Sequence, residues 1–179
     1  VTIEGTAAIM FHKWDQEAQG EKERSPKGSK IRKEDNPASY VYRNEKKEIC
    51  LPGEYLRQSI VGAAKFKQDP RSARASATNM FKAGIVVLTE LASLGAKKDW
   101  DYLDSRRVRI PKGGSVNRIR PAFLPGWKAT FFVQVILPEY IDQHLLHDVI
   151  AYAGKFCGVA EFRPTFGRFI VTEFKVENF

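Results

Sequence analysis

Asp35 is the residue in this sequence with the most obvious potential for chemistry, because it precedes Asn36-Pro37 in a strongly charged stretch. A carboxylate in such a loop can ligate a metal ion, and the ion can activate a water or a ribose 2′-hydroxyl next to a phosphodiester. Turns also favour aspartate, which bonds to the local backbone. Asp35 is therefore a candidate catalytic residue of a Mg²⁺-dependent nuclease, or a turn residue.

A second group of residues is basic and suits phosphate binding. From Arg106 to Lys128 the chain has seven lysines and arginines and no acid. Phe123 and Trp127 are interleaved with them, and aromatic rings can stack on unpaired bases. Basic residues of a first helix and a late loop complete the set. The predicted RNA-binding residues are Arg57, Arg107, Arg109, Lys112, Arg118, Arg120, Lys128, Arg163 and Arg168.

Other chemical motifs are weak. His144 and His147 lie three residues apart on a predicted helix, but nothing nearby is spaced to supply the further ligands of a zinc site, so a solvated face is expected. The sequence has no Walker loop, GxSxG, HExxH or dinucleotide fingerprint. We predict no metal site and no cofactor, with Mg²⁺ required only if Asp35 is catalytic.

The elements that must position these residues follow from apolar periodicity. Alternation predicts strands over 1–11, 127–137 and 168–176. Helical spacing predicts a helix from Pro52 to about Phe66, with Leu56, Ile60, Ala63 and Ala64 buried, and a second helix opened by Pro138. The apolar stripe of that second helix is expected to be Ile141, Leu145, Val149, Tyr152 and Phe156.

Two hairpins and one loop complete the pattern. Strands 39–43 and 48–51 flank a predicted turn, and a basic hairpin over about 105–125 turns at Gly113-Gly114. The segment 85–94 is either a buried strand or part of a helix. The segment from about 13 to 33 is charged and rich in Gly and Pro, and it is expected to be a mobile loop. Phe162 and Phe166 are expected to fill the core more readily than to stack on bases.

The strong elements follow the order strand, helix, strand, strand, helix, strand. This βαββαβ order predicts an α+β, ferredoxin-like fold, with extra hairpins inserted, in a single domain over residues 1–179. Many unrelated proteins share this order, so it does not specify a function.

Composition narrows the class of partner. Twenty-nine Lys and Arg against twenty-one Asp and Glu give a formal net charge of +8, which favours polyanions, nucleic acid first. Cys50 and Cys157 form no CxxC pattern and are expected to be free thiols in a reducing compartment. No apolar run reaches the ~18–20 residues of a membrane span. We expect a soluble, cytoplasmic protein without membrane contact.

Four short motifs together resemble the RAMP superfamily, in particular the guide-RNA-binding backbone subunits of type III CRISPR effector complexes. The motifs are Asp35-Asn36-Pro37, Leu51-Pro52-Gly53, Leu56-Arg57 and the loop 158–167. Glu54 and Tyr55 depart from the small hydroxyl residues usual in that family, and the late loop has fewer glycines. The resemblance implies an RNA-binding subunit, with the basic hairpin as a thumb that projects toward the next copy.

Three functional hypotheses therefore remain open. The first is a non-enzymatic module that binds single-stranded guide RNA, assembles with copies of itself as a helical filament and joins other CRISPR subunits. The second is a metal-dependent endoribonuclease of the same fold that uses Asp35. The third is a phage-encoded structural or assembly protein of the RAMP fold that binds no RNA.

Overall fold

The computed structural model describes residues 1–14, 20, 24–26, 36–109 and 114–177. The chain is mixed α+β, as the sequence predicts, and its described part has antiparallel strand pairs and three α-helices. The strands are β1 (Thr2–Gly5), β2 (Ile9–Met10), β3 (Tyr42–Arg43), β4 (Ile49–Pro52), β5 (Ile85–Val87), β6 (Leu91–Ser93), β7 (Tyr102–Arg109), β8 (Ser115–Phe123), β9 (Lys128–Thr130), β10 (Val133–Val135) and β11 (Phe169–Glu173). The α-helices are α3 (Gly53–Ala63), α4 (Thr78–Gly84) and α5 (Gln143–Tyr152).

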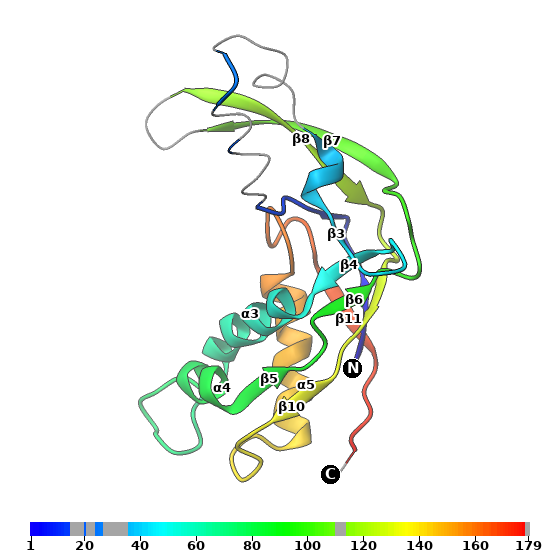
Figure 1. The fold of residues 1–179 in the computed structure, drawn as a ribbon. Coiled ribbons are helices and arrows are strands. Elements are labelled where there is room, and N and C mark those ends of the chain that lie inside the picture. Colours follow the sequence, from blue (N-terminus) through cyan, green and yellow to red (C-terminus); the bar gives the residue numbers. More distant parts are fainter. Residues whose placement is uncertain (15–19, 21–23, 27–35, 110–113, 178–179) are drawn as a thin grey trace.

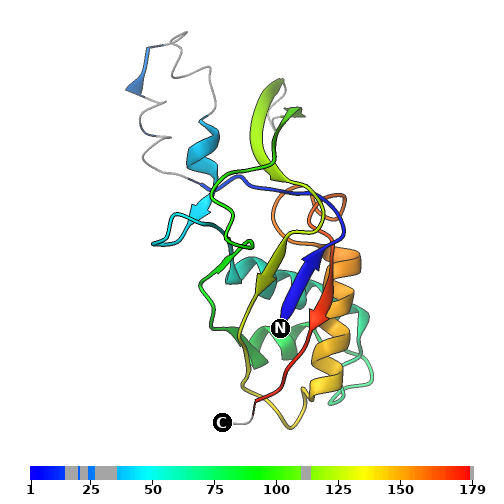
Figure 2. The ribbon, with the colours of Figure 1, turned by 90° about the vertical axis from the view of Figure 1, so that its right-hand side faces the viewer.

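The central sheet has the strand order β11-β1-β9, and β10 pairs antiparallel with β5. Exposed and less exposed side chains alternate without interruption from 128 to 136, so β9 and β10 are two halves of one extended segment. Its first half pairs with β1 and its second half with β5. Figure 2 shows the helices behind the strands β9, β1 and β11, and no helix of the described residues lies on the other face of this sheet.

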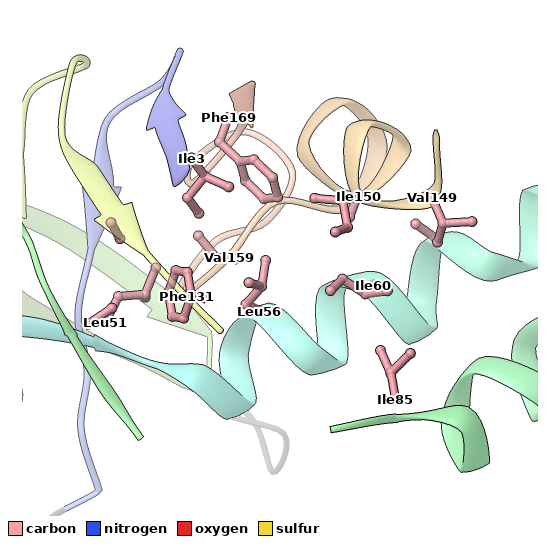
Figure 3. Close-up of a cluster of buried hydrophobic side chains, with 14 of the residues drawn as sticks. Ile3, Leu51, Leu56, Ile60, Ile85, Phe131, Val149, Ile150, Val159 and Phe169 are labelled. Carbon is pink, nitrogen blue, oxygen red and sulfur yellow. The ribbon is translucent and has the colours of Figure 1, made fainter. Parts of the chain in front are cut away.

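The hydrophobic core lies between the sheet and the helices. Ile3 of β1, Phe169 of β11 and Phe131 after β9 point toward Leu56 of α3 and Ile150 of α5 (Figure 3). All five are at most 2% exposed. The alternation of apolar residues in the strands and their helical spacing in α3 therefore bury one face of each element.

Both core helices end in an irregular turn. A 3-10 turn, Ala64–Phe66, extends α3, and a π-helical turn, Ala153–Cys157, extends α5. The first predicted helix is confirmed, and its four predicted core positions are buried.

The second helix differs from the prediction. It begins at Gln143 and not at Pro138, because the Asp142 side chain accepts hydrogen bonds from the backbone N–H groups of His144 and Leu145, each 2.8 Å long. Pro138 lies in a preceding turn. Of the predicted stripe, Ile141 and Val149 are buried, and Leu145 and Tyr152 are partly buried. The other buried positions are Leu146, Ile150 and Ala153.

The remaining strands build the other end of the molecule. The chain over 1–11, predicted as one strand, is divided into β1 and β2, and the ambiguous segment 85–94 forms β5 and β6. β4 pairs with β3 and β6, which confirms the first hairpin. β7 and β8 form a long curved hairpin that extends beyond the body, at the end opposite α4 and β5 (Figure 1).

Among the described residues, no helix has both the length and the apolar character required to cross a membrane.

Candidate nucleic-acid interface

The β7–β8 hairpin carries its basic side chains on two faces. In the antiparallel register Arg106 lies opposite Arg118, and Asp104 lies opposite Arg120, so these four residues share one face, called here the inner face. Arg107 and Arg109 occupy the alternate positions of β7 on the outer face, and both are exposed. A cluster that is continuous in sequence is thus divided between two surfaces.

The root of the hairpin is fixed in the body. β2 pairs with β8 through Ile9 and Met10, and the rings of Phe11 and Phe123 meet edge to face with centroids 5.9 Å apart. Ala122 and Phe123 are fully buried. The base of the hairpin is therefore part of the core, and the described strands extend from it as far as Arg109 and Ser115.

The inner face packs on the loop 158–167, and the contacting residues Arg120 and Phe162 are 42 positions apart in the sequence. The Arg106 guanidinium lies 4.5 Å from the ring centroid of Phe166 and 5.5 Å from that of Phe162, and Arg120 lies 5.0 Å from Phe162. Phe162 is 39% exposed, so the expectation that it fills the core is wrong. Its ring instead lies against arginines, where a cation–π contact is favourable.

Two glycines give that loop its shape. Gly158 (φ +71°) and Gly167 (φ +74°) both lie in the left-handed region. A Cβ on Gly167 would lie 1.8 Å from the carbonyl oxygen of Val159. The loop closes through a 2.9 Å hydrogen bond from the Val159 N–H to the Gly167 carbonyl. These glycines thus hold the two phenylalanines against the hairpin.

Arg120 is a structural arginine in this arrangement. It is only 7% exposed, and its Nε donates a 3.1 Å hydrogen bond to Nδ1 of His12. The His12 ring stacks on Tyr40 with centroids 4.3 Å apart. Neither His12 nor Tyr40 belongs to a recognisable motif, so no sequence signal could have identified this contact.

Arg106 is also engaged on the inner face. It donates through Nε and Nη2 to the two carboxylate oxygens of Asp104, and this contact raises the pKa of the Arg106 guanidinium. The described residues that remain most open to a phosphate on the hairpin are therefore Arg107 and Arg109. The Nε of Arg107 donates to the Ser115 hydroxyl, which leaves its terminal nitrogens available for a further acceptor.

Two other predicted residues lie on separate surfaces. Lys128 is on the face of the sheet without helices, where its ammonium lies 3.1 Å from the Glu4 carboxylate. Arg57 of α3 donates a 2.7 Å hydrogen bond to the carbonyl of Lys82 and lies 3.6 Å from Glu54. Arg57 therefore ties α3 to α4.

The start of α3 is already covered by protein. The Gly53 N–H donates a 2.9 Å hydrogen bond to the carbonyl of Glu90, and a Cβ on Gly53 would lie 2.0 Å from the Thr89 carbonyl oxygen. A cavity of about 500 Å³ lies beside it, lined by Lys13 and Arg43 but also by Glu54 and Glu90. The acids and the occupied N–H make this helix start a poor phosphate site.

Arg163 and Arg168 are both exposed, on either side of Phe166. Arg168 lines a cleft of about 360 Å³ between α5 and β11, together with Lys155 and His147. His144 and His147 are exposed, as expected, and His147 meets the Phe174 ring edge to face. The eight predicted RNA-binding residues that the structure describes are therefore not brought into one site.

Asp35 and Lys112 lie outside the described residues, as does most of the segment 13–33. Within the described part of the chain no group of three His, Cys, Asp or Glu side chains is arranged to hold a metal ion. Cys50 and Cys157 are free. Burial raises the pKa of both thiols, which keeps them protonated.

Comparison with known proteins adds no identity: no family model matches the chain, and no curated protein matches it.

Proposed function

We propose that this protein binds single-stranded RNA and assembles head to tail as the helical backbone of a CRISPR-type ribonucleoprotein complex in the cytoplasm. The observation that carries the proposal is the β7–β8 hairpin, which projects from the body with Arg107 and Arg109 exposed on its outer face (Figure 1). Guide RNA, further copies of the chain and other subunits of the complex are its proposed partners.

The sheet supports the RAMP-type interpretation. With β9 and β10 counted as one strand, the strands run in the order β11-β1-β9/β10-β5, and α3 and α5 lie on one face. Numbered along the chain, this is the order four, one, three, two that a ferredoxin-like βαββαβ domain requires. The basic hairpin is then an insertion between the second and third strands of one domain.

The charge arrangement favours a phosphate backbone as the ligand. Side chains two residues apart on a strand lie about 7 Å apart on the same face, so Arg107 and Arg109 present a short row of cations. Contacts of this kind position a nucleic acid without reading its bases. The proposed binding is accordingly weak in sequence preference and strongly dependent on salt.

Exposed apolar side chains on two separate surfaces support a head-to-tail filament. Leu103 and Ile119 lie on the outer face of the hairpin. Leu88 and Phe132 lie next to each other, directly after β5 and before β10, and Phe132 is 64% exposed. When two different surfaces of identical chains contact each other, each new copy leaves a free surface for the next. Such a contact generates a helical filament, except where the rotation between copies closes a ring. The hairpin of one copy is proposed to reach the β5–β10 surface of the next.

The salt dependence of RNA binding tests the proposal. For single strands the slope of log K against log salt is about −0.7 per neutralised phosphate, so Arg107→Ala/Arg109→Ala should flatten it by about 1.4. Arg74→Ala provides the control, because Arg74 is equally exposed but lies near α4. A slope that is unchanged in the hairpin variant would contradict the proposed interface.

A further inference from the structure

Three aromatic rings form an exposed cluster where α3 and α5 end. Phe66 and Phe156 have centroids 5.1 Å apart, Tyr152 and Phe156 5.5 Å, and Phe66 and Tyr152 6.5 Å. Phe66 is 48% exposed and Phe156 43% exposed. We call these three residues the aromatic cluster. It lies where these two helices of the helical layer end.

The irregular helix ends place these rings outward. In the 3-10 turn after α3, Ala64 takes the buried position and Phe66 points away from the core. In the turn after α5, Ala153 is buried, and its carbonyl accepts a 2.8 Å hydrogen bond from the Gly158 N–H, five residues on. This π-type turn carries Phe156 beside Phe66, and such turns are often found at functional sites.

Each ring of the cluster lies under a lysine. Lys65 lies 4.9 Å from the centroid of Phe66, Lys67 4.9 Å from that of Tyr152, and Lys155 5.2 Å from that of Phe156. The Asp148 carboxylate, at 2.7 Å, already balances Lys67. Within the described part of the chain Lys65 and Lys155 are in no ion pair, so the exposed rings adjoin two uncompensated positive charges.

The cleft between α5 and β11 adjoins the aromatic cluster through Lys155. It has a volume of about 360 Å³, and its polar side chains include Lys155, Arg168 and His147, with no carboxylate. Its remaining surface is largely apolar and includes Phe169 and Val171. Cations thus border a continuous surface that can accept apolar groups.

We propose that the aromatic cluster and the adjoining cleft together form a docking surface for an acidic, apolar peptide segment of a partner protein. Apolar side chains of that segment pack on Phe66 and Phe156 and enter the cleft, and its carboxylates pair with Lys65, Lys155 and Arg168. Charge complementarity at the edge and aromatic anchors at the centre are the usual composition of such an interface.

The cluster is less suited to single-stranded nucleic acid. Base stacking needs an open ring face, whereas a lysine covers one face of each ring and the other rings of the cluster contact it at steep angles. A carboxylate of a partner peptide, by contrast, can pair with a lysine ammonium while the lysine remains over its ring. The surface is separate from the outer face of the hairpin, so the inference does not depend on RNA binding.

Fluorescence anisotropy with the full chain tests the inference. The probe is a labelled, monomeric twelve-residue peptide of glutamates, leucines and one tryptophan, and a second peptide has glutamine in place of each glutamate. Saturable binding of the acidic peptide is expected, and Lys65→Gln/Lys155→Gln should weaken it by up to about fivefold for each exposed pair. Phe66→Ala/Phe156→Ala should weaken it by about tenfold or more.

Matched controls separate local from general effects. Lys46→Gln/Lys98→Gln removes two exposed lysines elsewhere, Trp14→Ala removes an exposed ring elsewhere, and both variants should bind as the wild type does. The glutamine of each lysine variant keeps an aliphatic stem beside the ring, and melting curves verify that the lysine and phenylalanine variants all fold. The glutamine peptide should bind more weakly and be insensitive to Lys65→Gln/Lys155→Gln.

Three results would overturn the inference. One is the absence of saturable binding of the acidic peptide. Another is an affinity that none of the cluster variants alters. The third is a fifteen-nucleotide single-stranded RNA that displaces the peptide and itself loses affinity in the Phe66→Ala/Phe156→Ala variant, which would make the surface a nucleic-acid site.

Discussion

Replacing Arg120 by alanine should destabilise the protein without changing the salt dependence of RNA binding. Arg120 and Arg107 belong to the same hairpin, but Arg120 is 7% exposed on the inner face and Arg107 is exposed on the outer face. The sequence assigned both to RNA. The structure gives them different roles, so the pair makes a matched comparison.

The magnitude follows from what Arg120 contacts. Its hydrogen bond to His12 has a charged donor, and loss of such a bond costs about 1.5 kcal/mol. Its contact with the Phe162 ring, 5.0 Å from the centroid, joins a buried guanidinium to a partly exposed ring and contributes about 1–2 kcal/mol. Arg120→Ala should therefore lower the free energy of unfolding by about 3 kcal/mol, a fall in Tm of about 6–12 °C for a chain of this length.

Thermal melts and RNA titrations measure the two effects independently. Arg107→Ala should leave Tm within about 2 °C of the wild type and flatten the salt slope by about 0.7. Arg120→Ala should show the reverse, a lower Tm and an unchanged slope. The reasoning fails if Arg120→Ala melts like the wild type and loses about 0.7 of the slope, because Arg120 would then be a phosphate contact.

Two further predictions concern stability. Gly154→Ala should lower the free energy of unfolding, measured in urea, by at least ~2 kcal/mol, because its Cβ would lie 2.1 Å from the Phe169 carbonyl oxygen. Gly62→Ala is the matched variant and should stabilise α3 by about 0.5–1 kcal/mol, because its Cβ would meet only the Cys157 sulfur, at 3.7 Å. The Arg71 guanidinium lowers the pKa of Asp69 from 3.8 to about 2. The ionised Asp69 therefore contributes its full stabilisation above pH 3.8 and loses it as the pH falls toward 2. Asp69→Asn should show a smaller decline of Tm between those two pH values.

Each of these has a contrary outcome. Equal unfolding midpoints for Gly154→Ala and the wild type would mean that α5 does not approach β11 as closely as described. A pH profile of Asp69→Asn that parallels that of the wild type between pH 4 and 2 would show that other carboxylates carry the acid sensitivity.

The sequence was sufficient to predict the helices and strands that are defined by the spacing of apolar residues within a short segment. The helical spacing of Leu56 and Ile60 places α3, and the alternation after Trp127 places β9 and β10. The predicted start of α5 was wrong, because the helix begins where the Asp142 side chain caps it and not at Pro138, a residue that is only tolerated in a first turn. The sequence also assigned Phe156 to the core, where the structure has a ring that is 43% exposed, because a regular helical period cannot anticipate the π-helical turn that carries it.

Less of the candidate site than of the fold could be predicted from the sequence. Composition identified the basic hairpin, but the division of its arginines between two faces depends on the strand register, with Arg106 opposite Arg118. The contacts of Arg120 with Phe162 and His12 join segments separated by about 40 and 108 residues, which no local pattern encodes.

Extraction of nucleic acid from the purified protein tests the central proposal most directly. The protein is purified at low salt, its absorbance ratio at 260 and 280 nm is recorded, and the phenol extract is run on a denaturing gel with and without ribonuclease. A filament subunit should yield ribonuclease-sensitive RNA in regularly spaced lengths, because each copy covers a fixed number of nucleotides. Protein that is free of nucleic acid, and that binds no added single-stranded RNA at low salt, would contradict the account.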